Sequence, residues 1–230
     1  MNLRDPSDIA RCIEHAARFL RSLSLDSDSW ALLDGPALKL QYPEFDSSAW
    51  RAHLNLYVLE QRLPWRAIDP EYAQPPAGEQ LTALMKASHL GAPIHIVPAS
   101  RYFRAGFEVC RFRLPSGNSA GLATVAGCAR VWSYKSAELV DAPQRFFGDG
   151  ERIAVERTQR LLAALALPID RNARSRLEML LTGYRALSRG AVRDAKAAFY
   201  RAAGRRWLAV RGPLANPSRV KAGSHYVDKV

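Results

Sequence analysis

Apolar residues recur every three to four positions near the start of the chain, from Ile9 to Leu23, and arginines occupy positions between them. This spacing predicts a helix that buries one face. Asp5 suits the N-cap position and Pro6 the first helical position, where a missing N–H costs nothing. We therefore expect the chain to open with an amphipathic helix.

The next segments carry weaker patterns. Residues 37–42 alternate apolar and polar side chains, which predicts a short strand. Residues 47–62 fit both a strand and a helical face. We favour a helix, because Asp46 or Ser47 offers an N-cap and the stretch is long for a strand. Residues 64–78 are rich in proline, which predicts an extended connector and an internal boundary. Residues 79–90 then predict a helix that ends at a glycine.

From Pro93 the period changes to two. Residues 94–97, 107–114, 120–125 and 128–134 each predict a strand, and a turn at 115–118 joins the second and third of these into a hairpin. Consecutive hairpin-like strands favour an antiparallel sheet that helices cover on one side.

Helical periodicity returns after residue 150. It predicts helices at about 151–167, 175–189 and 191–203, and Ser175 and Glu178 have the spacing of a capping box. The last two helices resemble one tetratricopeptide unit, because five residues match the pattern of small and large side chains of that family: Gly183, Gly190, Ala195, Phe199 and Ala202. Met179 and Trp207 stand where the family prefers tryptophan and proline. The sequence holds no second copy, whereas such arrays need about three, so we interpret the pair as a tight helical hairpin.

These elements predict an α+β fold with N-terminal helices, a small antiparallel sheet and a C-terminal basic helical bundle. We expect a body at 1–150, a basic helical subdomain at 151–206 and a flexible basic tail at 207–230. The net charge of +11 is uneven, because residues 1–150 hold sixteen basic and sixteen acidic side chains. Residues 171–221 carry thirteen lysines or arginines against two acids, Glu178 and Asp194. Such a division indicates a neutral body whose C-terminal surface faces a polyanion.

Several classes of protein do not fit the sequence. The three cysteines are far apart, and the N-terminus has no apolar signal segment, so we expect a cytosolic protein with reduced thiols. We also expect a prokaryotic protein. No run of eighteen apolar residues predicts a membrane span, and no membrane partner is expected. The five histidines lack metal-ligand spacing, and no phosphate-binding glycine loop is present, so we expect no cofactor.

One catalytic motif is present. Residues 117–121 match G-x-S-x-G, which would make Ser119 the nucleophile of a serine hydrolase with His225 as its base. That motif needs a buried strand before the serine and a helix after it, whereas strand-like residues follow Ser119. A glycine-rich hairpin turn is the better interpretation. A ribonuclease that works without metal, through arginine, tyrosine and histidine, stays open.

The charge distribution favours a non-enzymatic protein that binds DNA or RNA through its phosphates, because arginine suits bidentate phosphate contact. We expect other protein subunits as partners in a larger nucleoprotein assembly, for example a CRISPR effector or a mobile-element complex. The alternative is an adaptor that binds an acidic protein through the helical hairpin. The candidate nucleic-acid-binding residues lie on the C-terminal helices and tail (Arg174, Arg185, Arg189, Arg193, Lys196, Tyr200, Arg201, Arg205, Arg206 and Arg211) and on the sheet (Arg111, Arg113 and Arg130).

Overall fold

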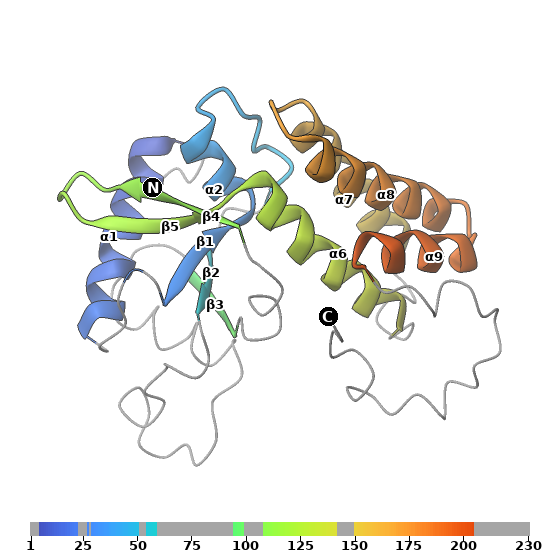
Figure 1. Ribbon diagram of the computed structural model, residues 1–230, viewed down its shortest axis with the longest axis horizontal. Coiled ribbons are helices and arrows are strands. Elements are labelled where there is room, and N and C mark those ends of the chain that lie inside the picture. The colour runs from blue at the N-terminus through green and yellow to red at the C-terminus, as the bar shows by residue number, and fades with distance from the viewer. Residues whose placement is uncertain are drawn as a thin grey trace, which may run out of the picture. The chain divides into compact units, whose positions relative to one another are not determined.

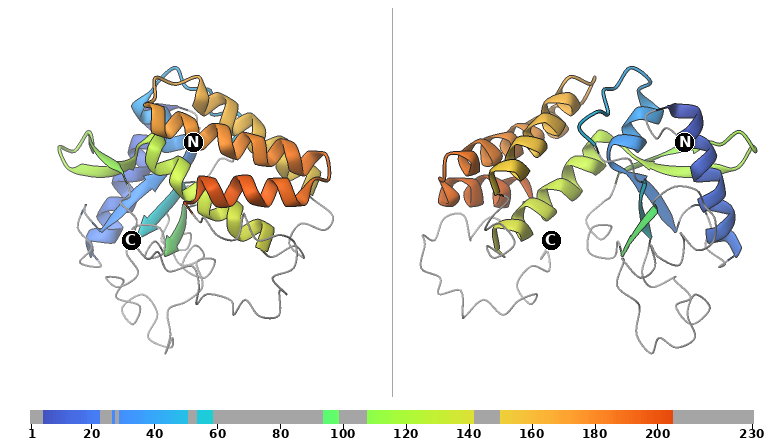
Figure 2. Two further views of the ribbon diagram at one scale, coloured as in Figure 1. Left: turned by 45° about the vertical axis from the view of Figure 1, so that its right-hand side comes forward. Right: turned by 180° about the vertical axis from the view of Figure 1, so that it is seen from behind.

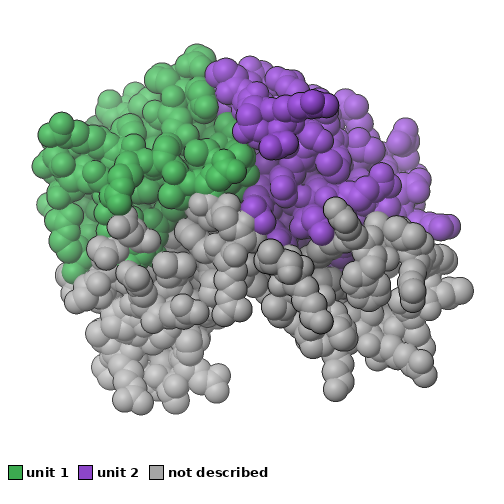
Figure 3. Space-filling view, viewed as in Figure 1, with its two compact units in different colours: residues 1–128 green, residues 129–230 purple. Residues whose placement is uncertain are grey.

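The computed structural model describes residues 5–22, 27, 29–50, 54–58, 94–98, 108–141 and 150–204. The chain divides into two compact units, Met1–Cys128 and Ala129–Val230, which we call the first and second unit (Figure 3). The predicted connector at 64–78, the predicted helix at 79–90 and the predicted tail at 207–230 lie outside the described residues.

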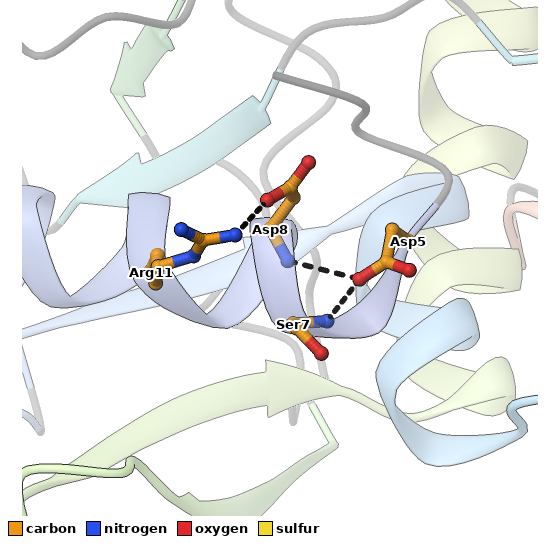
Figure 4. A network of polar contacts seen from close by, with 4 residues as sticks. All are labelled: Asp5, Ser7, Asp8 and Arg11. Atoms are coloured by element: carbon orange, nitrogen blue, oxygen red, sulfur yellow. Dashed lines mark hydrogen bonds and ion pairs between the residues drawn. The ribbon is translucent and has the colours of Figure 1, made fainter.

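The first unit opens with helix α1, Pro6–Ser22, as the periodicity predicts. The Asp5 carboxylate caps this helix and accepts hydrogen bonds from the backbone N–H groups of Ser7, at 2.8 Å, and Asp8, at 3.2 Å (Figure 4). Arg11 forms an ion pair with Asp8 one turn further along. The cap satisfies N–H groups that have no partner inside the helix, which is why the helix begins here.

Five strands form one mixed sheet in the order β3-β2-β1-β5-β4. The central strand β1 is antiparallel to β2 and parallel to β5, while β2 and β3 are parallel and β4 and β5 antiparallel. The α+β class is therefore confirmed, but the prediction of a purely antiparallel sheet is wrong. Parallel neighbours are joined by long connections, which a local residue pattern cannot reveal. The strands are β1 Trp30–Leu33, β2 Leu54–Val58, β3 Ile94–Pro98, β4 Val109–Arg113 and β5 Ser119–Ala123.

The predicted hairpin between β4 and β5 is confirmed. Arg113 is paired with Ser119 across the two strands, and the Leu114 N–H donates to the Asn118 carbonyl at 2.7 Å. Gly117 has a φ of 84° in the turn, a conformation that glycine adopts without steric cost. Exposed and half-buried positions alternate along β4, as the period of two predicts.

Three local predictions are wrong. Of residues 37–42, predicted as a strand, all but the last belong to helix α2, Asp34–Gln41. Residues 128–134, also predicted as a strand, lie in helix α6, Val125–Asp141. Residues 47–62, predicted as a helix, contain strand β2. Helices α2 and α6 bury side chains on several faces, so their apolar residues show no 3.6-residue period. No strand is predicted at β1, whose four residues are all buried and do not alternate.

The core of the first unit lies between the sheet and the two N-terminal helices (Figure 1). Leu32 of β1 and Leu122 of β5 are register partners at the centre of the sheet, and both are fully buried. Ile9 and Ile13 of α1 belong to the same buried cluster. Burial of each such side chain contributes roughly 1.5–3 kcal/mol, so α1 is held by its apolar face.

The second unit contains most of α6 and the helices α7, Gly150–Leu165, α8, Arg171–Ser188, and α9, Val192–Ala202. The three predicted C-terminal helices are therefore present. The start of α8 differs from the prediction, because Asp170 caps it and accepts from the backbone N–H groups at 172 and 173 at 2.7 and 2.8 Å. Ser175, the predicted cap, lies inside the helix.

Helices α7, α8 and α9 lie side by side, with α8 in contact with both neighbours (Figures 1 and 2). Gly183 of α8 faces the ring of Phe199 of α9, and a β-carbon at this position would lie 2.3 Å from Cε1 of the ring. The rings of Tyr184 and Phe199 are 4.8 Å apart between centroids. The hydroxyl groups of Tyr184 and Ser136 of α6 share a 2.6 Å hydrogen bond. Burial raises the pKa of Tyr184, so this phenol stays protonated.

Candidate nucleic-acid interface

Helix α8 exposes one face along its whole length. Its apolar residues, among them Leu177, Leu180 and Leu181, are buried against its neighbours. On the opposite side, exposed positions recur every three or four residues and therefore align along the helix. We call this row the α8 stripe, and its members are Arg171, Arg174, Glu178, Thr182, Arg185 and Arg189.

Helix α9 adds two exposed arginines, Arg193 and Arg201. They are eight residues apart, so they lie on the same side of the helix. Its other faces carry Ala195 and Phe199, both fully buried. The four arginines of the α8 stripe and these two on α9 are the exposed cations that we consider together.

These six arginines have no acidic partner among the described residues. None of them forms an ion pair there, whereas Arg11, Arg160 and Lys196 are paired with Asp8, Glu156 and Asp141. Like charges on one surface repel each other, and the repulsion is relieved when an anion binds. The helical hairpin therefore carries positive charge that the described part of the fold does not neutralise.

Two predicted site residues on α9 turn toward α6 instead. Lys196 Nζ is 2.8 Å from a carboxylate oxygen of Asp141 on α6 and 5.3 Å from the centre of the Tyr200 ring. Tyr200 is fully buried and donates a hydrogen bond from its hydroxyl to Asp141. The prediction that Tyr200 belongs to an exposed basic face is wrong, because its ring is buried and its hydroxyl is bonded to Asp141 of α6. Tyr200 cannot stack on a base in this arrangement.

Arg176 of α8 has a structural contact. Its guanidinium donates to the carbonyl oxygen of Ala202 at 2.6 Å, at the last residue of α9. A cation at this place satisfies a carbonyl group that has no partner inside the helix. Arg176 therefore ties the end of α9 to the start of α8 and is not part of the exposed set.

The three predicted sheet arginines do not share a face of the sheet. Arg111 and Arg113 are exposed on the edge strand β4, and an Arg111 nitrogen lies 3.5 Å from the Ser27 hydroxyl. Arg130 is half-buried in helix α6, and its Nε atom is buried without a hydrogen-bond partner in the described residues. The prediction that Arg130 belongs to the sheet is wrong because residues 128–134 are helical. Arg205, Arg206 and Arg211 lie outside the described residues.

The sequence pattern does not single out one exposed arginine of the candidate interface. Arg171 is not among the predicted site residues, because the predicted helix starts at Ser175. The N-cap at Asp170 extends α8 by one turn and places Arg171 and Arg174 on the stripe. Asp170, an acceptable N-cap that closely follows Pro168, is the sequence signal that could have located this start.

The alternative catalytic site lacks the geometry it needs. Ser119 is the first residue of strand β5, so a strand follows it rather than the helix of a nucleophile elbow. His225 lies outside the described residues. Among the residues that the structure describes, no group of three or more histidine, cysteine, aspartate or glutamate side chains could hold a metal ion. Within the same residues, no helix is both long enough and apolar enough to cross a bilayer.

Comparison of the chain with protein-family models, with curated proteins and with solved structures finds no match.

Proposed function

We propose that this protein binds nucleic acid through its phosphate backbone, with the exposed arginines of α8 and α9 as the contact residues. The observation that carries the proposal is the set of six exposed arginines on one hairpin that form no ion pair within the described residues. Guanidinium groups suit phosphate, because their planar donors can contact two oxygens at once.

The packing of the hairpin supports this use. Gly183 against Phe199, and Arg176 on the Ala202 carbonyl, hold α8 and α9 in a fixed relation. Arginines on two rigidly packed helices present charge at fixed positions, which lowers the ordering cost of binding. Contact with phosphates releases condensed counterions, and this release supplies the free energy of binding without any base-specific contact.

The test is a salt titration of binding to duplex DNA. Replacing Arg193 and Arg201 together by glutamine removes two phosphate contacts, so the slope of log K against log salt concentration falls by about 1.8. The matched control is the double substitution of Arg18 and Arg21 by glutamine, two exposed arginines on α1. The control removes the same charge from the first unit and is expected to leave the slope unchanged.

Two outcomes would contradict the proposal. Equal losses of slope in both double variants would show that only net charge matters. Binding of poly-glutamate, with no binding of DNA or RNA, would favour the adaptor for an acidic protein instead. Circular dichroism of each variant checks that the helices are intact.

A further inference from the structure

The α8 stripe has an uneven distribution of charge. Arg171 and Arg174 lie in its first turn, and Arg185 and Arg189 lie at its end. The midpoints of these two pairs are about 22 Å apart at a rise of about 1.5 Å per residue. The positive charge is therefore gathered in two arginine pairs at opposite ends of one helix.

The middle of the stripe is occupied by an acid and a neutral residue. Glu178 and Thr182 are both exposed there, and the Thr182 hydroxyl donates to the Glu178 backbone carbonyl at 2.9 Å. A row of phosphates that followed the stripe would pass directly over the Glu178 carboxylate, and like charges at such contact repel. A ligand that fits this surface has phosphates at both ends of α8 and none over its centre.

We infer that α8 lies across the major groove of double-stranded DNA, with one arginine pair on the phosphates of each strand; this inference rests on the proposed function. The major groove is about 12 Å wide, and the phosphates on its rims stand farther apart than its free width. The two arginine pairs are about 22 Å apart along α8. Their long side chains bridge the remaining difference between this span and the distance between the phosphates on the two rims. The minor groove, about 6 Å wide, is too narrow for this spacing.

A groove also explains why an acid is tolerated at Glu178. The floor of the major groove presents amino groups of cytosine and adenine, which donate hydrogen bonds, and no phosphates. The carboxylate of Glu178 can accept a hydrogen bond from such an amino group, and it meets no phosphate there. In A-form RNA the major groove is deep and narrow, so the two arginine pairs match B-form DNA better.

The aromatic residues of the second unit argue against a single strand. Proteins that hold single strands combine basic grooves with exposed rings on which bases stack. Among the described residues of the second unit every aromatic side chain is buried, namely Trp132, Tyr134, Tyr184, Phe199 and Tyr200. The described surface offers guanidinium groups for phosphates but no aromatic ring for a base.

The helix N-terminus itself is not the anion site. The Asp170 carboxylate already accepts the N–H groups at 172 and 173. A phosphate at this end is therefore held by the side chains of Arg171 and Arg174. The same side-chain contact holds the second strand at Arg185 and Arg189.

The inference is tested with a duplex of about 20 base pairs, which is about two helical turns, and with its separate single strands. Salt titrations compare the wild type with Glu178→Lys and with the matched control Glu44→Lys, an exposed acid of the first unit. On the duplex, Glu178→Lys is expected to change the salt slope no more than Glu44→Lys does. Glutamine at both members of either arginine pair is expected to lower the slope by about 1.8.

Two results would overturn the groove geometry while leaving nucleic-acid binding intact. One is a slope that rises by about 0.9 in Glu178→Lys above the control, because this would place a phosphate over the centre of α8. The other is tighter binding of the single strands than of the duplex. Failure of both the duplex and the single strands to bind would instead refute the proposed function itself.

Discussion

The contact between Gly183 and Phe199 sets how closely α8 and α9 approach, and Gly183→Ala tests it. A β-carbon at Gly183 would lie 2.3 Å from Cε1, 2.6 Å from Cδ1 and 3.0 Å from Cζ of the Phe199 ring. Phe199 is fully buried against Tyr184, so its ring cannot turn aside freely. The substitution therefore forces the two helices apart.

Two opposing effects decide how much Gly183→Ala changes the free energy of unfolding. Alanine is favoured over glycine in the middle of a helix by roughly 0.8–1.0 kcal/mol. Overpacking of a well-packed core costs about 1–3 kcal/mol, and a contact this short with a buried ring lies at the upper end. We expect Gly183→Ala to lower the free energy of unfolding by about 1–2 kcal/mol. A loss of 1 kcal/mol lowers Tm by about 4–8 °C in a domain of 60–100 residues.

The assay is urea unfolding followed by far-ultraviolet circular dichroism, carried out as a double-mutant cycle with Phe199→Leu. Leucine lacks the outer ring atoms and can rotate, so Gly183→Ala in this background is expected to be neutral or stabilising. Gly190→Ala is the control. Gly190 has a φ of 73°, and a β-carbon added there would meet nothing within 4 Å, so its cost of about 1–2 kcal/mol comes from backbone strain alone.

The cycle has a clear refuting result. If Gly183→Ala destabilises the protein equally in the wild type and in Phe199→Leu, the Phe199 ring is not what excludes a β-carbon. The cost of Gly190→Ala is expected to be the same in both backgrounds. A looser hairpin would also displace the arginines of α9 from those of the α8 stripe, so Gly183→Ala is expected to weaken the proposed DNA binding as well.

Two further predictions concern a helix cap and a carboxylate. Asp170→Ala removes the cap of α8 and is expected to lower the free energy of unfolding in urea by about 1 kcal/mol, whereas Ser175→Ala is expected to be near neutral. A larger loss for Ser175→Ala than for Asp170→Ala would show that Ser175 is the N-cap, as the sequence predicts. Hydrogen bonds from Ser116 hold the pKa of Glu14 below its usual value of 4.5. Their contribution to stability is present above pH 4.5 and is lost as pH falls through the lowered pKa, so the advantage of wild type over Glu14→Gln shrinks as the pH is lowered below 4.5. A difference in stability that stays constant as the pH is lowered would count against the hydrogen bonds.

Local patterns were sufficient where one period is clear, whereas strand β2 was predicted as a helix because its residues fit both periods. The apolar face of α1, the alternation along β4, and the glycine turn before β5 are all visible in residues that are close in the chain. They failed where an element is buried on several sides. Helices α2 and α6 and strand β1 carry buried apolar side chains on several faces. Their sequences therefore show neither the 3.6-residue period of a helix nor the two-residue period of a strand.

In the candidate interface, too, local sequence patterns do not tell which single residues are exposed. The excess of arginine at 171–221 is a property of composition and needs no structure. Which of those arginines are exposed depends on contacts between distant segments. Arg176 donates to the carbonyl of Ala202. Asp141 of α6 forms an ion pair with Lys196 and accepts a hydrogen bond from the Tyr200 hydroxyl.

The concentration of positive charge on C-terminal helices can be read from the amino-acid sequence, because charge and helical period are both properties of neighbouring residues. The division of the α8 charge into two arginine pairs, with Glu178 between them, becomes visible only in the folded chain. The start of α8 depends on the Asp170 cap, and its exposed face is what remains after α7 and α9 cover the others.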